Sequence, residues 1–218
     1  MIDRMAKLRA TTISVSLDGY MAGPDQSLDN PLGVGALDLH QWLFGTKSWQ
    51  ASHGDGVGAT GVDDDFAARA NENIGATIMG RNMFGPVRGP WPDDSWTGWW
   101  GENPPFHHDV FVLSHHPRES FSLDGGTTFH FVTDGPEAAL SQAVAAADGK
   151  DVRVGGGASA IQQYLRLGLL DELHMAIVPV LLGAGERIFD HLDGGPTGYR
   201  CAEMVSSPAV THVRLVRD

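Results

Sequence analysis

The chain has 218 residues, 42% of them hydrophobic, so it can bury one substantial core, and a single domain spanning residues 1–218 is expected. The 15 basic and 27 acidic residues give a net charge of -12, which disfavours nucleic acid and anionic membranes as partners. One cysteine, Cys201, excludes an intrachain disulfide, and no apolar run reaches the ~20 residues of a membrane helix. The start of the chain also lacks the apolar region of a secretory signal, so we expect a cytoplasmic protein.

The first half of the chain predicts two strands separated by a long, partly irregular excursion and a helix. The first strand is rich in Thr, Ile and Val, and the pair Asp18-Gly19 ends it. The helix has acidic residues in its first turn and an inward stripe of Phe66 and Ala70. In chain order the elements are a strand at 8–17, a glycine-rich excursion at 29–61 with a short helix at 40–44, a helix at 63–73 and a strand at 76–79.

The second half alternates apolar strands with helices. Asp134 and Glu137 resemble a capping box at the start of one helix, and Gly149 ends it. Strand, helix and strand in succession predict an α/β fold with a mixed, mostly parallel sheet flanked by helices and finished by an antiparallel hairpin. The strands lie at 110–113, 128–132, 152–154 and 173–182, the helices at 134–149 and 158–167, and the hairpin strands at 199–205 and 209–216.

A glycine turn joins the predicted strand at 152–154 to the helix that follows. The residues Gly155-Gly156-Gly157 would let a phosphate approach the backbone, and the free N–H groups of the helix start favour an anion. A tight strand-helix turn without a ligand is the alternative. The pattern is neither a Rossmann fingerprint nor a P-loop.

A second glycine, Gly80, ends the strand at 76–79 and is followed by Arg81. The arginine is expected at the carboxyl edge of the sheet, where ligands of open α/β folds bind and where its planar fork suits a phosphate. A surface arginine with no ligand is the alternative.

These two motifs, with Ser114-His115 at the end of an intervening strand, resemble the NADPH-binding framework of dihydrofolate reductases. Three further stretches resemble the reductase half of the riboflavin-pathway deaminase-reductases, and no stretch of the 218 residues resembles the deaminase half. They are Ser14-Val15-Ser16-Leu17-Asp18-Gly19-Tyr20-Met21-Ala22, Asp171-Glu172-Leu173 and Pro179-Val180-Leu181-Leu182-Gly183-Ala184-Gly185. The resemblance implies a three-layer, dihydrofolate-reductase-like fold.

The resemblance also implies a cofactor site for NADPH, with the adenosine phosphates near the Gly-Arg motif and the nicotinamide end near the glycine turn. The implied cofactor-binding residues are Gly80, Arg81, Asn82, Ser114, His115, Gly155, Gly156, Gly157, Ala158 and Ser159. Asp18 would face the substrate as the catalytic residue, Tyr20 and Ala22 would contact the substrate, and the loop at 20–26 would close over both ligands.

The role of Asp18 has several readings from the residues. A carboxyl group in a desolvated pocket can have a raised pKa and supply a proton, or it can anchor the substrate by hydrogen bonds. In the plainest reading, Asp18-Gly19 is a turn pair.

Three positions depart from the family patterns, namely Met83, where a Thr or Ser is usual, Val154, where a Glu is usual, and Tyr20. The substrate is therefore left open among aminopyrimidines and pterins.

A tryptophan-rich segment and two pairs of histidines are further candidates for a functional role. Trp91, Trp96, Trp99 and Trp100 share one segment, which is expected either to fold onto its own core or to meet a second subunit, with direct substrate contact as a further alternative. The pairs His107-His108 and His115-His116, with Asp109, raise a metal site as an alternative, but adjacent strand residues face opposite ways, so no metal is expected.

The expected function is an NADPH-dependent reductase that transfers a hydride to a pterin-like or aminopyrimidine substrate. The activity that the resemblance implies is reduction of 5-amino-6-(5-phosphoribosylamino)uracil in riboflavin biosynthesis. The alternatives are a dihydrofolate or pterin reductase and a non-catalytic NADPH-binding module. The late strand and the hairpin are expected to offer a sheet edge for pairing, and the resemblance favours a homodimer.

Overall fold

A computed structural model of the chain describes residues 6–85, 88–194 and 197–218. The elements of the first half are β1 (Leu8–Ser16), β2 (Tyr20–Ala22), η1 (Ala36–His40), α1 (Gln41–Phe44), α2 (Lys47–His53), α3 (Val62–Asn71), β3 (Ile74–Gly80) and α4 (Arg81–Phe84). Those of the second half are β4 (Asp109–Leu113), β5 (Phe121–Leu123), η2 (Asp124–Gly126), β6 (Thr127–Val132), α5 (Pro136–Ala146), β7 (Asp151–Gly156), α6 (Ala158–Arg166), β8 (Glu172–Val178), β9 (Glu186–Arg187), β10 (Tyr199–Ser206) and β11 (Thr211–Arg217).

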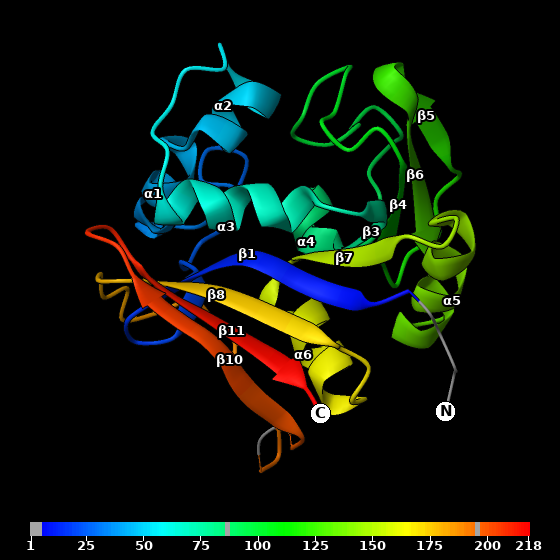
Figure 1. Ribbon diagram of the computed structural model, residues 1–218. Coiled ribbons are helices and arrows are strands. Elements are labelled where there is room, and N and C mark those ends of the chain that lie inside the picture. The colour runs from blue at the N-terminus through cyan, green and yellow to red at the C-terminus, as the bar shows by residue number, and fades with distance from the viewer. Residues whose placement is uncertain (1–5, 86–87, 195–196) are drawn as a thin grey trace.

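A nine-stranded sheet in the order β10-β11-β8-β1-β7-β3-β4-β6-β5 runs through the molecule (Figure 1). The six strands from β8 to β6 in this order are parallel to one another. Strand β11 is antiparallel to β8, β10 is antiparallel to β11, and β5 is antiparallel to β6. The predicted mixed, mostly parallel sheet with a terminal hairpin is confirmed. Parallel strands need crossover connections, and the helices supply them on both faces.

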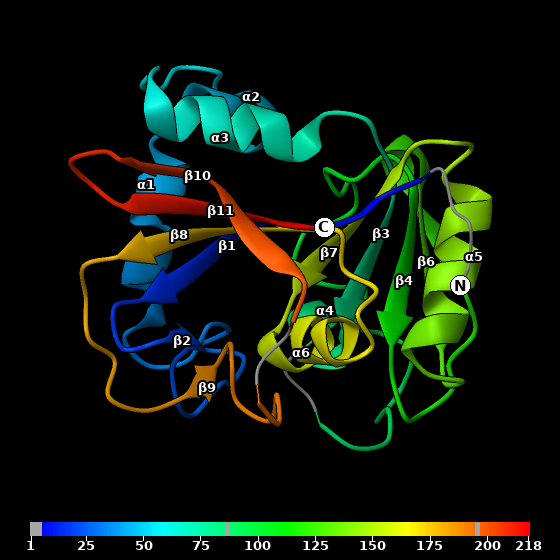
Figure 2. The ribbon, with the colours of Figure 1, turned by 60° about the horizontal axis from the view of Figure 1, so that its bottom comes forward.

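The two faces of the sheet are covered differently. Helices α5 and α6 bury Leu140, Ile161 and Tyr164 against one face, in the main core cluster. On the opposite face, η1, α1 and α3 cover β8, and an aromatic cluster around Phe84 and Phe129 covers β3, β4 and β6. Figure 2 shows α3 and α6 on opposite sides of the sheet. This second face is thus covered by two separate blocks.

Helix α5 begins differently from the prediction. Its N-cap is Gly135, which makes no side-chain capping hydrogen bond, so the expected capping box of Asp134 and Glu137 is wrong. Pro136 occupies the start of the helix, where its fixed φ suits the first turn and its missing N–H leaves no donor unpaired. The proline therefore explains this start better than a polar cap.

The late strand is shorter than the predicted 173–182, because β8 ends at Val178. Pro179 has no N–H to continue the ladder, and the amides of Leu182 and Gly183 donate to the carboxylate of Asp18 instead. Strand β8 also lies between β1 and β11, so it offers no free edge, and the prediction of an exposed edge holds only for β10. Within the described ranges, no helix is both long enough and apolar enough to cross a membrane.

Candidate functional site

A cavity of about 270 Å³, here called the edge cavity, lies at the carboxyl ends of the central strands. Strand β3 lies between β7 and β4, so the parallel strand ends Gly80 and Leu113 come together there with the start of α6. Seven predicted cofactor residues line this cavity, namely Gly80, Arg81, Asn82, Ser114, His115, Gly157 and Ser159. Residues up to 79 positions apart in the sequence thus meet at one sheet edge, as ligand sites of open α/β folds do.

The other three predicted cofactor residues lie elsewhere. Gly155 lines a second cavity on the face of the sheet, Ala158 is buried, and Gly156 lines neither cavity. The hydroxyl of Ser114 is occupied within its own turn, since it donates to the carbonyl of His116 at 2.9 Å and accepts from the His116 N–H at 3.0 Å. Ser114 therefore forms part of the cavity wall, and its hydroxyl group is not free to donate to a ligand.

Arg81 has unused donors in the edge cavity. Its guanidinium lies over the ring of Trp91, 3.2 Å from the centroid, and Nη1 donates to the carbonyl of Gly85 at 3.2 Å. The buried Nε and Nη2 have no hydrogen-bond partner among the described residues. Burial first, and then the charge of Arg118, lower the pKa of Arg81 to about 10. A buried cation with free donors fits an oxyanion such as a phosphate.

A second arginine stands at the mouth of the same cavity. Arg88 donates to Glu186 at 2.9 Å and lies within 3.5 Å of Gln26, which ends the loop expected to close over the ligands. Arg88 and Glu186 both line the edge cavity. The loop at 20–26 is therefore connected to the rim of this cavity through exposed polar contacts.

The second cavity, of about 390 Å³ and here called the face cavity, opens between the two blocks that cover the second face of the sheet. Thr11, Thr12, Arg153 and Gly155 of strands β1 and β7 contribute to its lining. Helices α2 and α3 line it on one side, and Trp100 and Phe106 line it on the other. Gly155 was predicted as a cofactor residue, direct substrate contact was one alternative for Trp100, and the others were not predicted as site residues. The signal that could have identified Arg153 is a charge in the middle of an otherwise apolar strand.

Met83 and the glycine turn lie between the two cavities. Met83 lines the face cavity, and a Cβ atom on Gly155 would lie 3.1 Å from its Cε. Gly157 lines the edge cavity, and nothing lies within 4 Å of the position of a Cβ there. The glycine turn therefore contributes to both cavities, Gly155 to the face cavity and Gly157 to the edge cavity, whereas Met83 lines only the face cavity of the two.

The face cavity exists because β1 departs from β7. The two strands pair in register only from Leu8 to Ala10, and the pairing of β1 with β8 shifts between Ala10 and Ile13. Thr12 has a positive φ of 56° in this bulge. A bulge redirects a strand at the expense of its ladder, and here it separates the two strands at the centre of the sheet.

A chain of histidines holds the bulge. The N–H of Thr12 donates to Nδ1 of His174 at 3.1 Å, so a neutral His174 carries its proton on Nε2, which lies 3.0 Å from Nδ1 of His212. Nε2 of His212 then donates to Asp63 at 2.9 Å. Burial, followed by the charges of His212, Arg69 and Arg214, lowers the pKa of His174 to about 3. Both rings stack on Phe66.

Asp18, the predicted catalytic residue, lines neither cavity. Its carboxylate accepts hydrogen bonds from the hydroxyl of Ser16 at 2.6 Å and from the amides of Leu182 at 3.1 Å and Gly183 at 2.8 Å. The Ser16 bond, together with the Gly183 and Leu182 amides, lowers its pKa to about 2 despite some opposing desolvation. A carboxylate so stabilised accepts hydrogen bonds and does not carry a proton near neutral pH.

The predicted substrate residues Tyr20 and Ala22 lie in β2, which pairs with β9 in a small ribbon. Arg187 of β9 lies over the ring of Tyr20, 5.2 Å from its centroid, and donates to the carbonyl of Asp18 at 2.9 Å. Neither Tyr20 nor Ala22 lines the edge cavity or the face cavity. The ribbon reaches the edge cavity through Glu186.

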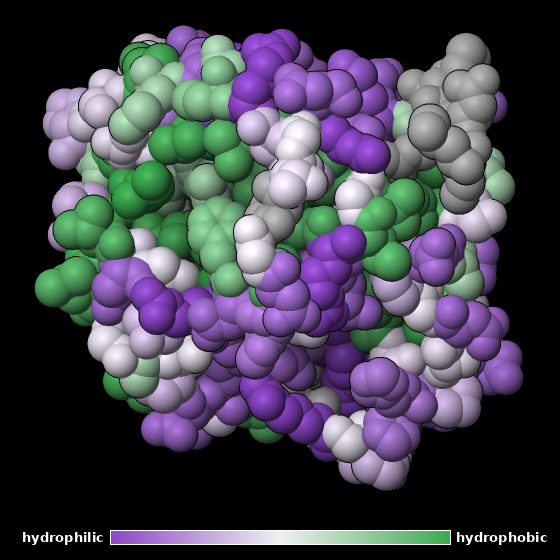
Figure 3. Space-filling model, turned by 90° about the horizontal axis from the view of Figure 1, so that it is seen from below, coloured by the Kyte–Doolittle hydropathy of each residue, from purple (hydrophilic) through white to green (hydrophobic). Residues whose placement is uncertain are grey.

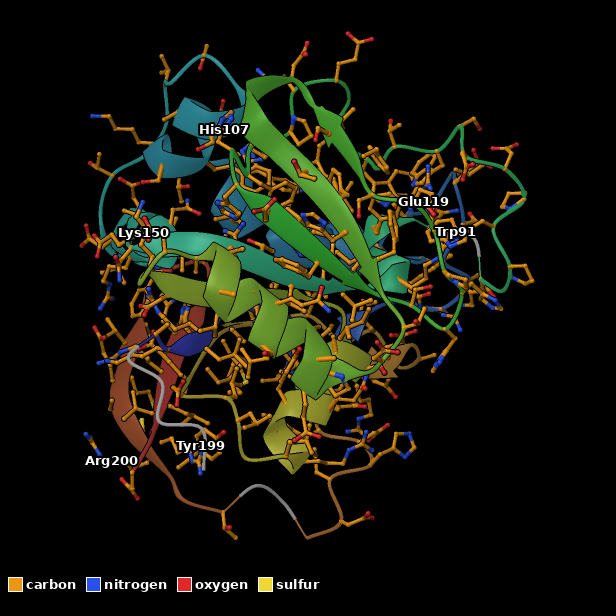
Figure 4. All side chains as sticks on the ribbon, turned by 90° about the vertical axis from the view of Figure 1, so that its right-hand side faces the viewer. Trp91, His107, Glu119, Lys150, Tyr199 and Arg200 are labelled. Atoms are coloured by element: carbon orange, nitrogen blue, oxygen red, sulfur yellow. The ribbon has the colours of Figure 1, made fainter. Side chains whose placement is uncertain are left out.

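The tryptophan segment packs largely on its own core. Trp91 donates to the carbonyl of His116 at 3.1 Å, and Trp96 donates to that of Phe84 at 3.0 Å. The guanidinium of Arg118 lies 4.9 Å from the centroid of the Trp91 ring, and Figure 4 shows Trp91 on the opposite side of the view from His107. Trp100 differs from the other tryptophans of this segment, because it also lines the face cavity.

The histidine pairs do not gather. Nδ1 of His107 lies 2.8 Å from the carbonyl of Gly125, and Nε2 of His108 lies 2.8 Å from the hydroxyl of Thr77. Asp109 pairs with His130 at 3.0 Å instead. Across the described parts of the chain, no three His, Cys, Asp or Glu side chains form a metal-binding group.

The sheet order and the crossovers define the chain as a protein of dihydrofolate-reductase-like architecture. The Enterococcus faecalis dihydrofolate reductase complexed with NADP(H) and RAB-propyl superposes with a TM-score of 0.50 at 12% identity, over 99% of this chain and 98% of that one. The family model of the RibD C-terminal domain matches residues 8–204, and the chain therefore belongs to that family.

Two further solved structures share this fold. A putative riboflavin biosynthesis protein from Shewanella sp. PV-4 superposes with a TM-score of 0.62 at 21% identity, over 98% of this chain and 99% of that one. The diaminohydroxyphosphoribosylaminopyrimidine deaminase/5-amino-6-(5-phosphoribosylamino)uracil reductase of Thermotoga maritima gives 0.55 at 12% identity, over 98% of this chain but only 57% of that one. A 41-residue stretch is 49% identical to the uncharacterized protein YyaP of Bacillus subtilis (strain 168), and the match covers 19% of this chain and about a fifth (22%) of that protein.

Proposed function

We propose that residues 1–218 form a single reductase domain that uses NADPH to reduce a C=N bond in an aminopyrimidine-like or pterin-like substrate. The formal activity is reduction of 5-amino-6-(5-phosphoribosylamino)uracil, the reductase activity that the Thermotoga maritima protein is named for. The observation that carries the proposal is the pair of buried donors on Arg81 that have no hydrogen-bond partner among the described residues, in a cavity bounded by the ends of β3 and β4 and the start of α6. Such donors favour a phosphate-bearing ligand.

The edge cavity supplies the groups that NADPH requires. Arg81 and Arg88 would meet its phosphates, with Asn82, Ser114, His115 and Ser159 around them, and the N–H groups at the start of α6 favour an anion. Gly155, Gly156 and Gly157, followed by Ala158, would let the nicotinamide end approach the backbone. When bound, this cofactor supplies the hydride, and the protein supplies position and polarity.

We assign Asp18 a positioning role. Its carboxylate holds the tail that follows β8 against the end of β1, through the amides of Leu182 and Gly183. A proton donor would need a pKa near neutral, and the hydrogen bonds to Asp18 move its pKa in the opposite direction. Tyr20 and Ala22 act from the neighbouring ribbon, as part of the loop that borders the bound ligands.

Calorimetric titration with NADPH and NADH, on the wild type and on Arg81→Ala, tests the proposal. We expect NADPH to bind more tightly than NADH, and Arg81→Ala to weaken NADPH binding roughly tenfold to a hundredfold, as for lost hydrogen bonds to a charged group. Arg200→Ala is the matched control, because that arginine is exposed on the outer hairpin. Equal binding by the wild type and Arg81→Ala would contradict the site.

A coupled assay separates the reductase from a binding module. NADPH oxidation is followed at saturating cofactor with aminopyrimidine and dihydropterin acceptors. Consumption with one class identifies the substrate type, whereas tight NADPH binding with no consumption by either class would favour the non-catalytic alternative.

We also propose a homodimer in the cytoplasm. Apolar side chains are exposed after β1 and after β8, and Figure 3 shows a hydrophobic area at the left of the face seen from below. They include Leu17, Leu28, Val34, Leu37 and Leu181. Light scattering that gives the monomer mass of 23.3 kDa at micromolar concentration would rule the dimer out.

A further inference from the structure

The face cavity carries one permanent charge and no compensating carboxylate among its described lining residues. That charge belongs to Arg153, whose Nη1 donates to the side-chain oxygen of Asn71 at 2.8 Å. Its Nε is buried and has no hydrogen-bond partner in the described part of the chain. Burial, and then the charge of Arg9, lower the pKa of Arg153 to about 10. Burying a cation without a counterion costs free energy. The protein has a net charge of -12 and therefore many carboxylates, but none of the described residues that line the cavity is a carboxylate that could act as the counterion.

The histidines of the cavity do not add charge at neutral pH. His40, His53 and His108 all line it, and desolvation is the largest cause lowering the pKa of each, that of His108 to about 4. They remain neutral hydrogen-bonding groups. Arg153 is therefore the feature that gives the cavity its positive character.

The walls of the cavity are flat and aromatic. Trp49 and His53 stack with centroids 3.8 Å apart and an interplanar angle of 4°, on the helix side. On the other side the rings of Trp100 and Phe106 meet edge to face at 4.9 Å, and the guanidinium of Arg153 lies 5.9 Å from the Phe106 centroid. A flat ring between these walls would place its substituents beside the arginine.

We propose that the face cavity binds a planar heteroaromatic compound bearing an anionic oxygen group, and that Arg153 is the specificity-determining residue that binds this group. The cavity adjoins the glycine turn at Gly155, and Gly157, two residues further along the same turn, lines the edge cavity. The identification of this compound as the hydride acceptor rests on the proposed function. The selection of a heteroaromatic anion by the cavity does not depend on that function. The anionic group is either a carboxylate on the ring or a phosphate on an attached sugar.

Three pyrimidines distinguish these possibilities. Orotate carries a carboxylate on its ring, uridine monophosphate carries a phosphate on its sugar, and uracil is the neutral ring. Each is titrated calorimetrically into the wild type, Arg153→Met and the control Arg200→Met, with and without NADPH. We expect at least one anion to bind the wild type and Arg200→Met alike and to bind Arg153→Met roughly tenfold to a hundredfold more weakly. Uracil should bind weakly and without dependence on Arg153.

The thermal unfolding of the unliganded variants shows whether Arg153→Met folds and whether the arginine is a structural one. An arginine kept for a ligand predicts that Arg153→Met unfolds at the same temperature as the wild type or higher, because an unpaired buried charge has been removed. The proposal is overturned if neither anion binds, if uracil binds as well as the anions, or if Arg153→Met binds them as the wild type does. If NADPH fails to bind while an anion still depends on Arg153, the reductase proposal fails and the anion site stands.

Discussion

Lowering the pH from about 7.5 to about 5 should destabilise the protein through His174. Its ring is 2% exposed and its pKa is about 3, so the folded protein keeps it neutral while the unfolded chain, with a pKa of about 6.5, takes up a proton. The stabilisation is present above the unfolded pKa and is lost progressively as the pH falls toward the folded one. Linkage over this interval gives a loss of about 2 kcal/mol from this residue alone.

Urea unfolding of the wild type and of His174→Asn at both pH values measures this loss. Asparagine can still accept from the Thr12 amide but does not titrate, so the variant should lose about 2 kcal/mol less than the wild type between the two pH values. His108 also has a lowered pKa and contributes equally to both proteins, because it does not contact His174. His212 does contact His174, at 3.0 Å, so the difference between the two losses reports His174 together with this neighbour. The reasoning is refuted if the two losses are equal. If the variant does not fold, an NMR titration of wild-type His174 with a midpoint near 6.5 would refute it instead.

Three substitutions test other parts of the structure. Asp18→Asn removes one of the oxygens that accept from Leu182 and Gly183, so these amides should exchange hydrogen faster while NADPH affinity is kept; unchanged exchange would contradict the anchoring role. Met83→Thr should change NADPH affinity by less than about twofold, because residue 83 lines the face cavity; calorimetry that shows tenfold tightening would place its side chain at the pyrophosphate. Phe84→Ala should cost about 3–5 kcal/mol in urea unfolding, since Phe84 is fully buried against Phe129 and Trp91, and a cost below about 1 kcal/mol would show that this aromatic cluster repacks.

The order of the main strands and helices was predictable because local residue patterns mark where each of them begins and ends. Apolar runs such as 152–154, closed by glycines, define parallel strands, and the stripe of Phe66 and Ala70 defines α3. The ends depended on tertiary partners instead. Strand β8 stops at Val178 because Pro179 follows it and Asp18, more than 150 residues earlier, binds the amides beyond. No local sequence pattern predicts these hydrogen bonds between Asp18 and the segment that follows β8.

The candidate site also has a part that was predicted from the sequence and a part that was not. Gly80, Arg81 and Gly157 were found because strand ends in a parallel sheet meet at one edge, and a motif marks each. The face cavity was not found, because it depends on a bulge at Thr12 held by His174 and His212, distant residues without a motif. Arg153 was visible only as a charge inside an apolar strand, which sequence alone does not connect to Trp100 or His53.

The short pairing between β1 and β7 has a mechanical consequence. Their ladder covers only Leu8 to Ala10, whereas β1 stays paired with β8 as far as Ser16. We therefore expect the sheet to bend more easily at this short ladder than at the longer ladders on either side of it. Such bending would change the width of the face cavity, which is lined by residues of both β1 and β7.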